Sequence, residues 1–280
     1  MSRLEAFQAL RPLLFAIAYR MLGVAAEADD VLQDAWLRWQ ATTAPIESDK
    51  AWLSTVVTRL CLDRLKSARA TREEYVGPWL PEPVATDARV DPDSISMAFL
   101  VLLERLTPVE RAAYLLHEVF DYSHAEVAAI LGKEIPACRQ IFHRAQARVH
   151  EGRPRFSPTR AEHERLLQVF ADALMSGQLD ALEHALASDA TLWADSGGKV
   201  RGAARQPIHG ATHIAAFFAG LLRKFPPGPG QTFEVIDING WPALVGRLHG
   251  AANLVLSIDT DGERIIAIRN VVNPDKLGRI

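Results

Sequence analysis

Two hydrophobic patterns follow one another along this chain of 280 residues, and their order limits the folds open to it. Up to about residue 175, apolar side chains recur three or four positions apart, as on one face of an amphipathic helix. After residue 231 they gather in short segments rich in Val, Ile and Leu, which are typical of strands. Helices followed by an antiparallel sheet predict an α+β domain at the end of the chain. We expect its strands at 232–238, 243–248, 253–258 and 264–271, with a tight hairpin turn at Asp261 and Gly262.

The helical part divides into two blocks. The first block has helical periodicity over residues 4–22, 26–40 and 49–70, which predicts a bundle of three helices. A segment with four prolines and several acids follows, which is typical of a linker, although it also carries the apolar Trp79 and Leu80. We therefore expect an all-α domain at 1–72, a linker at 73–93, a second all-α domain at 94–155, an α+β domain at 159–272 and a tail at 273–280.

Composition indicates a globular protein. Hydrophobic residues make up 49% of the chain and charged residues 23%, and no apolar run is long enough to cross a membrane. The two cysteines, Cys61 and Cys138, fall on apolar helix positions without a CxxC pattern, so we expect them to be reduced and the protein to be cytoplasmic. A net charge of −3 argues against a protein that holds nucleic acid by bulk electrostatics, so either the basic surface is local or a partner supplies affinity.

The segment from Ser123 to Ala147 predicts a helix-turn-helix. Ser123 and Glu126 form a capping box that starts a short helix, and Gly132 allows a tight turn after it. A second helix, starting near Ile135, turns its apolar residues inward and leaves a donor-rich face outward, which is the geometry needed to reach base edges and phosphates. That face consists of Arg139, Gln140, His143 and Arg144. The alternative is an ordinary helical hairpin with a solvated basic face.

The first helical block carries two further candidate surfaces. Acids and Gln33 crowd the second helix beside Trp36, which indicates a protein-docking surface, or else simple stabilisation of the helix dipole by acids in its first turn. On the third helix, Trp52, Arg59 and Arg64 can stack on an unpaired base and hold its backbone. The alternative is a core tryptophan beside a solvated charged face.

The segments AEADDVLQDAWLRWQ, AWLSTVVTRLCLDRLKSA and the helix-turn-helix resemble, in order and spacing, an extracytoplasmic-function sigma factor of the sigma-70 family. The resemblance covers residues 1–155. It implies that Asp30, Gln33 and Asp34 dock on core RNA polymerase, and that Trp52, Arg59 and Arg64 lie on the helix that reads the −10 element of promoter DNA. It also implies that Arg139, Gln140, His143 and Arg144 read the −35 element, although Pro136-Ala137-Cys138 replaces the Gly-Thr-Val common in the family.

Three short motifs extend the resemblance over nearly the whole chain. GPWLPEP in the linker, DSGGK after residue 194 and NPDKL near the end are similar to those of the sigma factors with a fused SnoaL-like domain, a cone-shaped fold shared with nuclear transport factor 2-like proteins. Apolar residues in a proline-rich linker need a surface on which to be buried, so we expect the linker to dock near the DSGGK turn with NPDKL as a clasp. The residues of this regulatory contact are Trp79, Leu80, Pro81, Asp195, Ser196, Gly197, Gly198, Lys199, Asn273, Pro274, Asp275, Lys276 and Leu277.

SnoaL-like domains include enzymes, so a second hypothesis is a small-molecule-binding or isomerase- or cyclase-type domain fused to a DNA-binding region. Asp195, His209 and His213 are its candidate residues, since an acid and a histidine in an apolar cone can move protons. Alternatively, Asp195 only caps its turn and the histidines only begin a helix near 212–224. No metal set, nucleophile pair or phosphate loop accompanies them. We therefore expect a transcription initiation factor without catalytic residues or cofactor, whose third domain adjusts its activity in cis. Binding of a small ligand by that domain is an alternative that the sequence leaves open.

Overall fold

The computed structural model describes residues 2–86, 94–152 and 158–280. The chain forms two compact units: a helical unit of residues 1–74 with 100–153, and a sheet unit of residues 75–99 with 154–280. The end of the expected linker, 87–93, and the expected domain boundary at 155 lie outside the described residues. In the part that is described, no helix is both long enough and apolar enough to cross a membrane.

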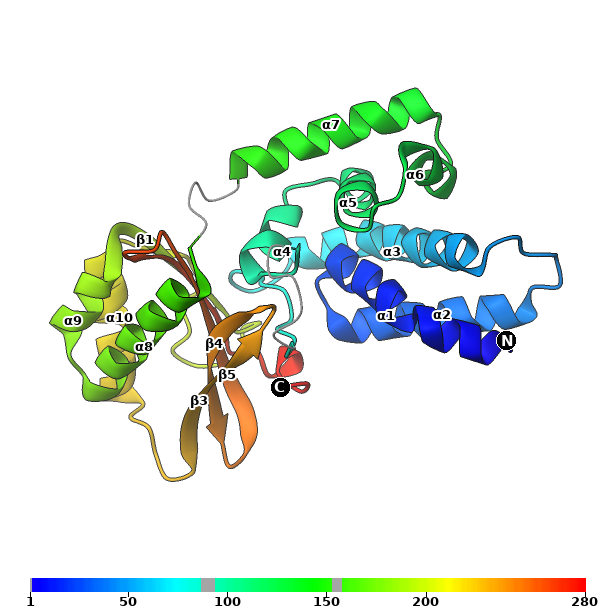
Figure 1. Cartoon of the computed structure of the whole chain (residues 1–280). Coiled ribbons are helices and arrows are strands. Elements are labelled where there is room, and N and C mark those ends of the chain that lie inside the picture. Colours follow the sequence, from blue (N-terminus) through cyan, green and yellow to red (C-terminus); the bar gives the residue numbers. More distant parts are fainter. Residues whose placement is uncertain (1, 87–93, 153–157) are drawn as a thin grey trace. The chain divides into compact units, whose positions relative to one another are not determined.

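Three long helices begin the helical unit (Figure 1): α1 (Arg3–Leu22), α2 (Ala25–Ala41) and α3 (Asp49–Glu73). A capping box between Ser2 and Glu5 starts α1, and Gly23 ends it in the left-handed region with a φ of 72°. The three helices bury apolar stripes between them, including Ile17 and Trp39. This is the bundle that the helical periodicity predicts.

Helix α4 (Met97–Leu103) crosses the boundary between the units at residue 100. Two short helices, α5 (Pro108–Tyr114) and α6 (His124–Leu131), a π-helical turn η2 (Leu115–Val119) and the longer α7 (Ile135–Gly152) complete the helical unit. Ser123 and Glu126 form the expected capping box at the start of α6, and Gly132 ends α6 with a φ of 62°. The helix-turn-helix is therefore formed by α6 and α7. The π-helical turn has no counterpart in the sequence pattern.

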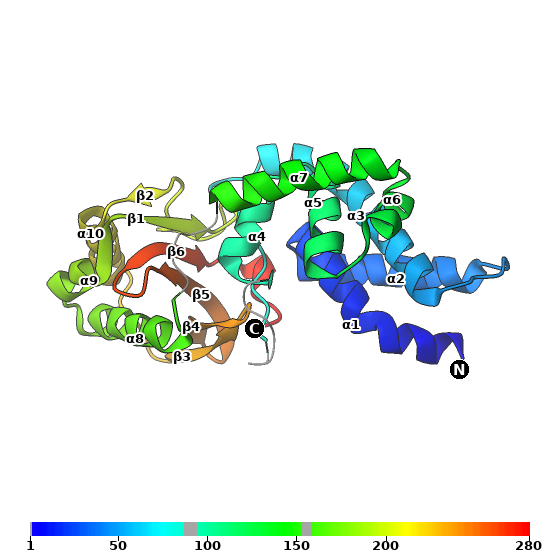
Figure 2. The ribbon, with the colours of Figure 1, turned by 45° about the horizontal axis from the view of Figure 1, so that its top comes forward.

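The sheet unit contains α8 (Arg160–Ser176), α9 (Leu179–Ala185), α10 (Ala211–Lys224) and a six-stranded sheet. The strands are β1 (Leu186–Asp195), β2 (Ile208–His209), β3 (Gln231–Ile238), β4 (Trp241–Leu248), β5 (Ala251–Thr260) and β6 (Ile265–Val271), in the order β2-β1-β6-β5-β4-β3. The three helices lie together against the sheet (Figure 2). Their buried residues, among them Phe170 and Phe218, share one core with Leu192, Leu256 and Ile268 of the strands.

The sheet differs from the expected one in one respect. Four strands and the β5–β6 hairpin at Asp261 and Gly262 lie where the sequence predicts them. However, β1 and β2 are additional, and β1 pairs in parallel with β6, so the sheet is mixed and not wholly antiparallel. The inward residues of β1 include Ala190 and Ala194, and alanine has little strand propensity, which explains why the pattern of β1 is weak.

Candidate functional site

The exposed face of α7 carries all four residues expected to read the −35 element. Arg139, Gln140, His143 and Arg144 are exposed, whereas Cys138 and Phe142 on the opposite face are buried. Phe142 packs against the Tyr114 ring at 6.2 Å between centroids. The apolar face therefore fixes the rotation of α7 and leaves the donor-rich face to solvent.

Two arginines of α7 are tied to a buried carboxylate at the start of α5. Glu110 closes the capping box with Thr107, and Arg148 lies 2.7 Å from its carboxylate while Arg144 lies 3.8 Å away. Burial acts to raise the pKa of Glu110, but the hydrogen bonds from Thr107 and the charges of both arginines outweigh it and lower that pKa. Arg144 is thus held on the exposed side of α7 by an acid that stays ionised.

Two half-buried imidazoles, one from η2 and one from the first turn of α6, stack on each other. The rings of His117 and His124 are 3.9 Å apart, and both pack edge-on against Phe142. His117 Nδ1 lies 2.7 Å from the Tyr122 carbonyl oxygen, which can only accept, so this nitrogen carries the proton. Burial, and then the positive charges of neighbouring groups, lower the pKa of His124.

The expected polymerase-docking acids face one of the expected DNA-binding arginines. Arg64 of α3 lies 3.3 Å from Asp34 and 3.5 Å from Asp30, both on α2, and it donates to the Glu27 carbonyl oxygen at 3.2 Å. Gln33 is exposed on the same helix. The structure therefore brings residues from two expected surfaces into one charged cluster on α2 and α3.

Helix α3 also contacts the second helical block within the helical unit. The hydroxyls of Ser54 and Tyr122 lie 2.7 Å apart and are buried, and Arg59 Nε donates to the Ile130 carbonyl oxygen at 3.3 Å. Trp52, in the first turn of the same helix, is half-buried. The two helices expected to read promoter DNA thus belong to one packed unit.

The linker residues surround Asp195, whose side chain is fully buried at the end of β1. Its carboxylate accepts hydrogen bonds from the Leu80 backbone N–H at 2.8 Å, the Tyr75 hydroxyl at 2.5 Å and Lys276 Nζ at 2.7 Å. Burial, and then the hydrogen bond and charge of Asp195, raise the pKa of Tyr75. We call Tyr75, Leu80, Asp195, Asn273 and Lys276 the linker clamp.

Lys276 connects the tail to the linker at several points. Its Nζ donates to the Leu80 carbonyl oxygen at 2.5 Å and lies 4.3 Å from the centre of the Trp79 ring. Leu80 and Pro81 are buried and Trp79 is half-buried. The tail folds as a 3₁₀ turn, η3 (Pro274–Lys276), followed by the buried Leu277. The tail and the linker therefore share one buried polar centre.

The DSGGK turn packs against the same tail. Gly197 N–H donates to Asp195 at 3.2 Å, Gly198 N–H donates to the Ser196 hydroxyl at 3.2 Å, and Lys199 pairs with Asp275. Gly197 has a φ of 55°, and a Cβ there would lie 2.7 Å from Asn273 Nδ2. Asn273 Nδ2 itself donates to the Tyr75 hydroxyl at 2.8 Å. Glycine at 197 is required both by conformation and by space.

Sequence reasoning missed two residues that hold the linker. Tyr75 precedes the recognised GPWLPEP motif, and Asn239 occupies the β3–β4 turn with a φ of 53°. The Asn239 side chain accepts from Val84 N–H at 3.1 Å and donates to the Ile95 carbonyl oxygen at 3.1 Å, so it binds the chain on both sides of the undescribed segment. The Asn-Gly pair at 239–240 is a strong hairpin signal and was available in the sequence.

The three residues of the enzyme hypothesis do not meet. His209 pairs with Thr191 across β1 and β2, and Asp195 lies four residues further along β1, which is about 13 Å in a strand. His213 donates through Nδ1 to the His209 carbonyl oxygen at 3.0 Å. Within the described ranges, no three His, Cys, Asp or Glu side chains are grouped as metal ligands.

Comparison with known proteins assigns the family. The family model of sigma-70 region 2 matches residues 6–71, and that of sigma-70 region 4 matches residues 96–149. The ECF RNA polymerase sigma factor SigJ of Mycobacterium tuberculosis is 37% identical over 288 aligned positions, which cover 96% of this chain and 91% of that protein. This chain belongs to the ECF RNA polymerase sigma factors.

Other members of the family agree with this assignment. A probable ECF RNA polymerase sigma factor of M. tuberculosis, SigI, is 30% identical, and the alignment covers 97% of this chain and 93% of SigI. The crystal structure of M. tuberculosis SigJ superposes with a TM-score of 0.76 at 34% identity and covers 98% of each chain. The similarity therefore extends through the sheet unit, and the expected fold class, two helical sigma domains followed by an α+β domain, is confirmed for this sigma factor.

Proposed function

We propose that this sigma factor binds core RNA polymerase and directs it to promoters, acting in the cytoplasm and without catalysis of its own. In this proposal the −35 element is contacted by Arg139, Gln140, His143 and Arg144. The −10 element is contacted by Trp52, Arg59 and Arg64. Asp30, Gln33 and Asp34 dock on the polymerase. The exposed donor-rich face of α7, fixed by a buried apolar face, is the observation that supports DNA reading best.

We further propose that the sheet unit adjusts this activity through the linker clamp. The linker connects the two DNA-reading blocks, and its backbone is hydrogen-bonded to Asp195, Asn239 and Lys276. The −10 and −35 elements are named for positions roughly 25 base pairs apart, or about 85 Å of duplex. Because blocks in contact cannot span that distance, a domain that holds their linker can favour or oppose the separated arrangement by a shift of population.

Transcription on genomic DNA tests the proposed function and locates the promoters in the same experiment. Core polymerase is incubated with sheared DNA of the source bacterium, with and without the full-length protein, and the 5′ ends of the transcripts are sequenced. We expect new start sites that share two sequence motifs upstream at a constant spacing. The absence of protein-dependent start sites, with active core polymerase shown by a second sigma factor, contradicts the proposal.

A further inference from the structure

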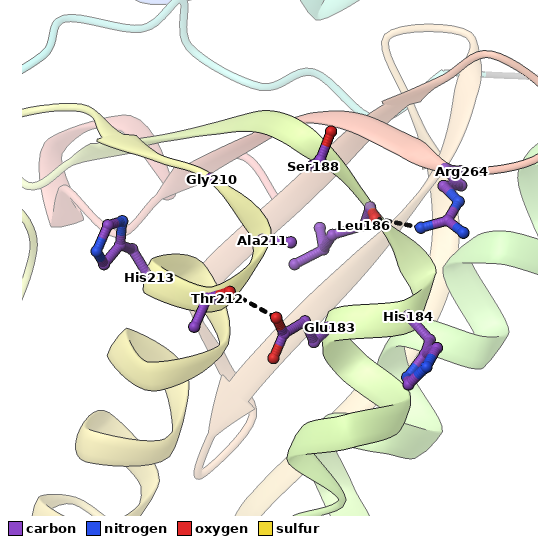
Figure 3. A pocket seen from close by; sticks show the side chains of 9 residues that line it. All are labelled: Glu183, His184, Leu186, Ser188, Gly210, Ala211, Thr212, His213 and Arg264. Atoms are coloured by element: carbon purple, nitrogen blue, oxygen red, sulfur yellow. Dashed lines mark hydrogen bonds between the residues drawn. The ribbon is translucent and has the colours of Figure 1, made fainter.

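A pocket of about 580 Å³ lies in the sheet unit between the end of α9, the start of β1 and the first turn of α10 (Figure 3). Its volume falls within the range of pockets that hold small molecules. Leu186 and Ala211, both buried, contribute an apolar floor. The proposed transcriptional role does not use this pocket, and the linker clamp lies at the other end of β1.

Two side chains of opposite charge line the pocket, and each is held in place. The Thr212 hydroxyl donates to a carboxylate oxygen of Glu183 at 2.5 Å, and Arg264 Nη1 donates to the Leu186 carbonyl oxygen at 3.3 Å. Figure 3 shows both bonds as dashed lines on opposite sides of the floor. Among residues 2–86, 94–152 and 158–280, neither Glu183 nor Arg264 has an ion-pair partner. Each charge is therefore oriented but not neutralised.

Both groups keep unused hydrogen-bonding capacity. A carboxylate has two oxygens, and a guanidinium has five N–H donors, of which the single bond to Leu186 uses one. His184 adds a further group, because its Nδ1 donates to the Asp180 carbonyl oxygen at 2.5 Å and its Nε2 stays available. Side chains that are already oriented lose less conformational entropy when a ligand binds.

We propose that this pocket binds a small zwitterion, an amino acid whose ammonium group pairs with Glu183 and whose carboxylate pairs with Arg264. A simple anion would be repelled by Glu183 and a simple cation by Arg264, so a ligand that carries both charges matches the pocket best. The carbon skeleton would cover Leu186 and Ala211, from which it displaces water. The inference goes beyond the proposed function and does not depend on it.

Calorimetric titration of the full-length protein, without polymerase or DNA, tests the inference. The probes are the isomers leucine and 6-aminohexanoate, which have the same atoms but different charge separation, with their N-acetyl and carboxamide derivatives. We expect at least one isomer to bind at millimolar concentration or below. Loss of either charge should weaken binding at least tenfold, about the effect of one charged hydrogen bond.

Each of two variants should abolish one of these preferences. In Glu183→Gln, the N-acetyl derivative should bind as well as the free amino acid, because no carboxylate awaits an ammonium group. In Arg264→Gln, the carboxamide should bind as well as the free acid. Glu263→Gln and Arg223→Gln, exposed in the same unit, are matched controls and should behave as wild type, and thermal melts establish that all four variants are folded.

Either of two results overturns the inference: neither isomer binds at millimolar concentration, or an isomer binds to folded Glu183→Gln and Arg264→Gln proteins with the same affinity as to the wild-type protein. Start-site mapping with core polymerase reports on the proposed function separately, so the failure of one leaves the other measurable.

Discussion

Asp195 and Lys276 form an ion pair that is almost entirely removed from water, with exposed side-chain fractions of 0% and 8%. Such a pair is favourable only when further hydrogen bonds satisfy both groups, and here Tyr75 and the backbone of Leu80 supply them. The linker is thus part of the polar centre that keeps these charges paired.

Removal of Lys276 should expose this dependence. Lys276→Met leaves the Asp195 charge buried and unpaired, so we expect the free energy of unfolding of the sheet unit to fall by about 3–5 kcal/mol. Lys199→Met, which removes an exposed pair with Asp275, should cost about 0–1 kcal/mol. Urea denaturation followed by tryptophan fluorescence measures both. Asp195→Asn added to Lys276→Met should recover part of the loss, and wild-type stability of Lys276→Met contradicts the role of the pair.

A second residue, His124, makes the helix-turn-helix sensitive to acid. Its pKa lies below the usual 6.5, because it is partly buried and because His117, Arg139 and His143 place positive charge nearby. The unfolded chain therefore takes up this proton at a higher pH than the folded chain does. The contribution of His124 to stability is fully present above about pH 6.5 and declines as the pH falls below that value.

NMR titration of the imidazole protons should give a midpoint below 6.5 for His124. The melting temperature of the wild-type protein should decrease when the pH is lowered from 7.5 to 5.5. His124→Gln should make this decrease smaller, because the side chain at position 124 no longer titrates. A midpoint at or above 6.5 for His124 is the outcome that contradicts this account.

At the scale of elements, α7 combines a buried apolar face with an exposed face that we expect to contact DNA. Arg139→Ala with Arg144→Ala should abolish −35 protection in footprints of the holoenzyme, since each lost base contact costs about 1–3 kcal/mol. The fold should survive, because both side chains are exposed and the buried Phe142 is unchanged. Unchanged −35 protection by a folded double variant removes these residues from the DNA contact.

The acidic side of α2 is the second element with a specific expectation. Asp30→Lys with Asp34→Lys should weaken binding to core polymerase, because a reversed charge meets like charge at the docking surface. The change also removes the partners of Arg64, so circular dichroism must show an intact helical unit. Glu47→Lys, an exposed acid in the α2–α3 loop, is the control. Equal affinities of the double variant and wild type, measured by calorimetry, count against this surface.

Sequence reasoning recovered most elements because their signals are local. The capping box at Ser123 and the apolar periodicity of the helices depend on residues a few positions apart. The parallel pairing of β1 with β6 depends on contacts between residues about 75 positions apart, which no local pattern encodes. Strand β1, with alanines at inward positions, was missed for that reason and because its apolar signal is weak.

The candidate site residues likewise divide into those that a sequence pattern indicates and those that only tertiary contacts reveal. The motifs containing Trp79, Asp195 and Lys276 were predicted to meet because apolar linker residues need a covering surface and because the three motifs resemble those of one family. Nothing in their spacing indicates contact. Tyr75 and Asn239 belong to no such motif, and their roles follow from tertiary packing alone. The direct hydrogen-bond partners of each clamp residue therefore required the structure.

At the scale of the whole molecule, the feature that matters for regulation is the order in which the chain passes through the two units. The chain leaves the helical unit after residue 74 and re-enters it at residue 100, and the intervening linker belongs to the sheet unit. Any change in how the sheet unit holds residues 75–86 is therefore transmitted by the chain itself to the connection between the two DNA-reading blocks. Regulation in cis needs no separate protein in this scheme.

Transcription by purified core polymerase from one mapped promoter tests this central claim most directly. The amount of specific transcript and the affinity for core polymerase are measured for the full-length protein, for a deletion of residues 273–280 and for Lys276→Met. We predict that both changes alter transcript yield severalfold while the affinity for core polymerase stays the same, because the clamp acts on the linker and not on α2. Wild-type yield from both variants, each shown to have a disrupted clamp by faster hydrogen exchange of the Leu80 amide that donates to Asp195 in the wild type, would contradict regulation through the linker.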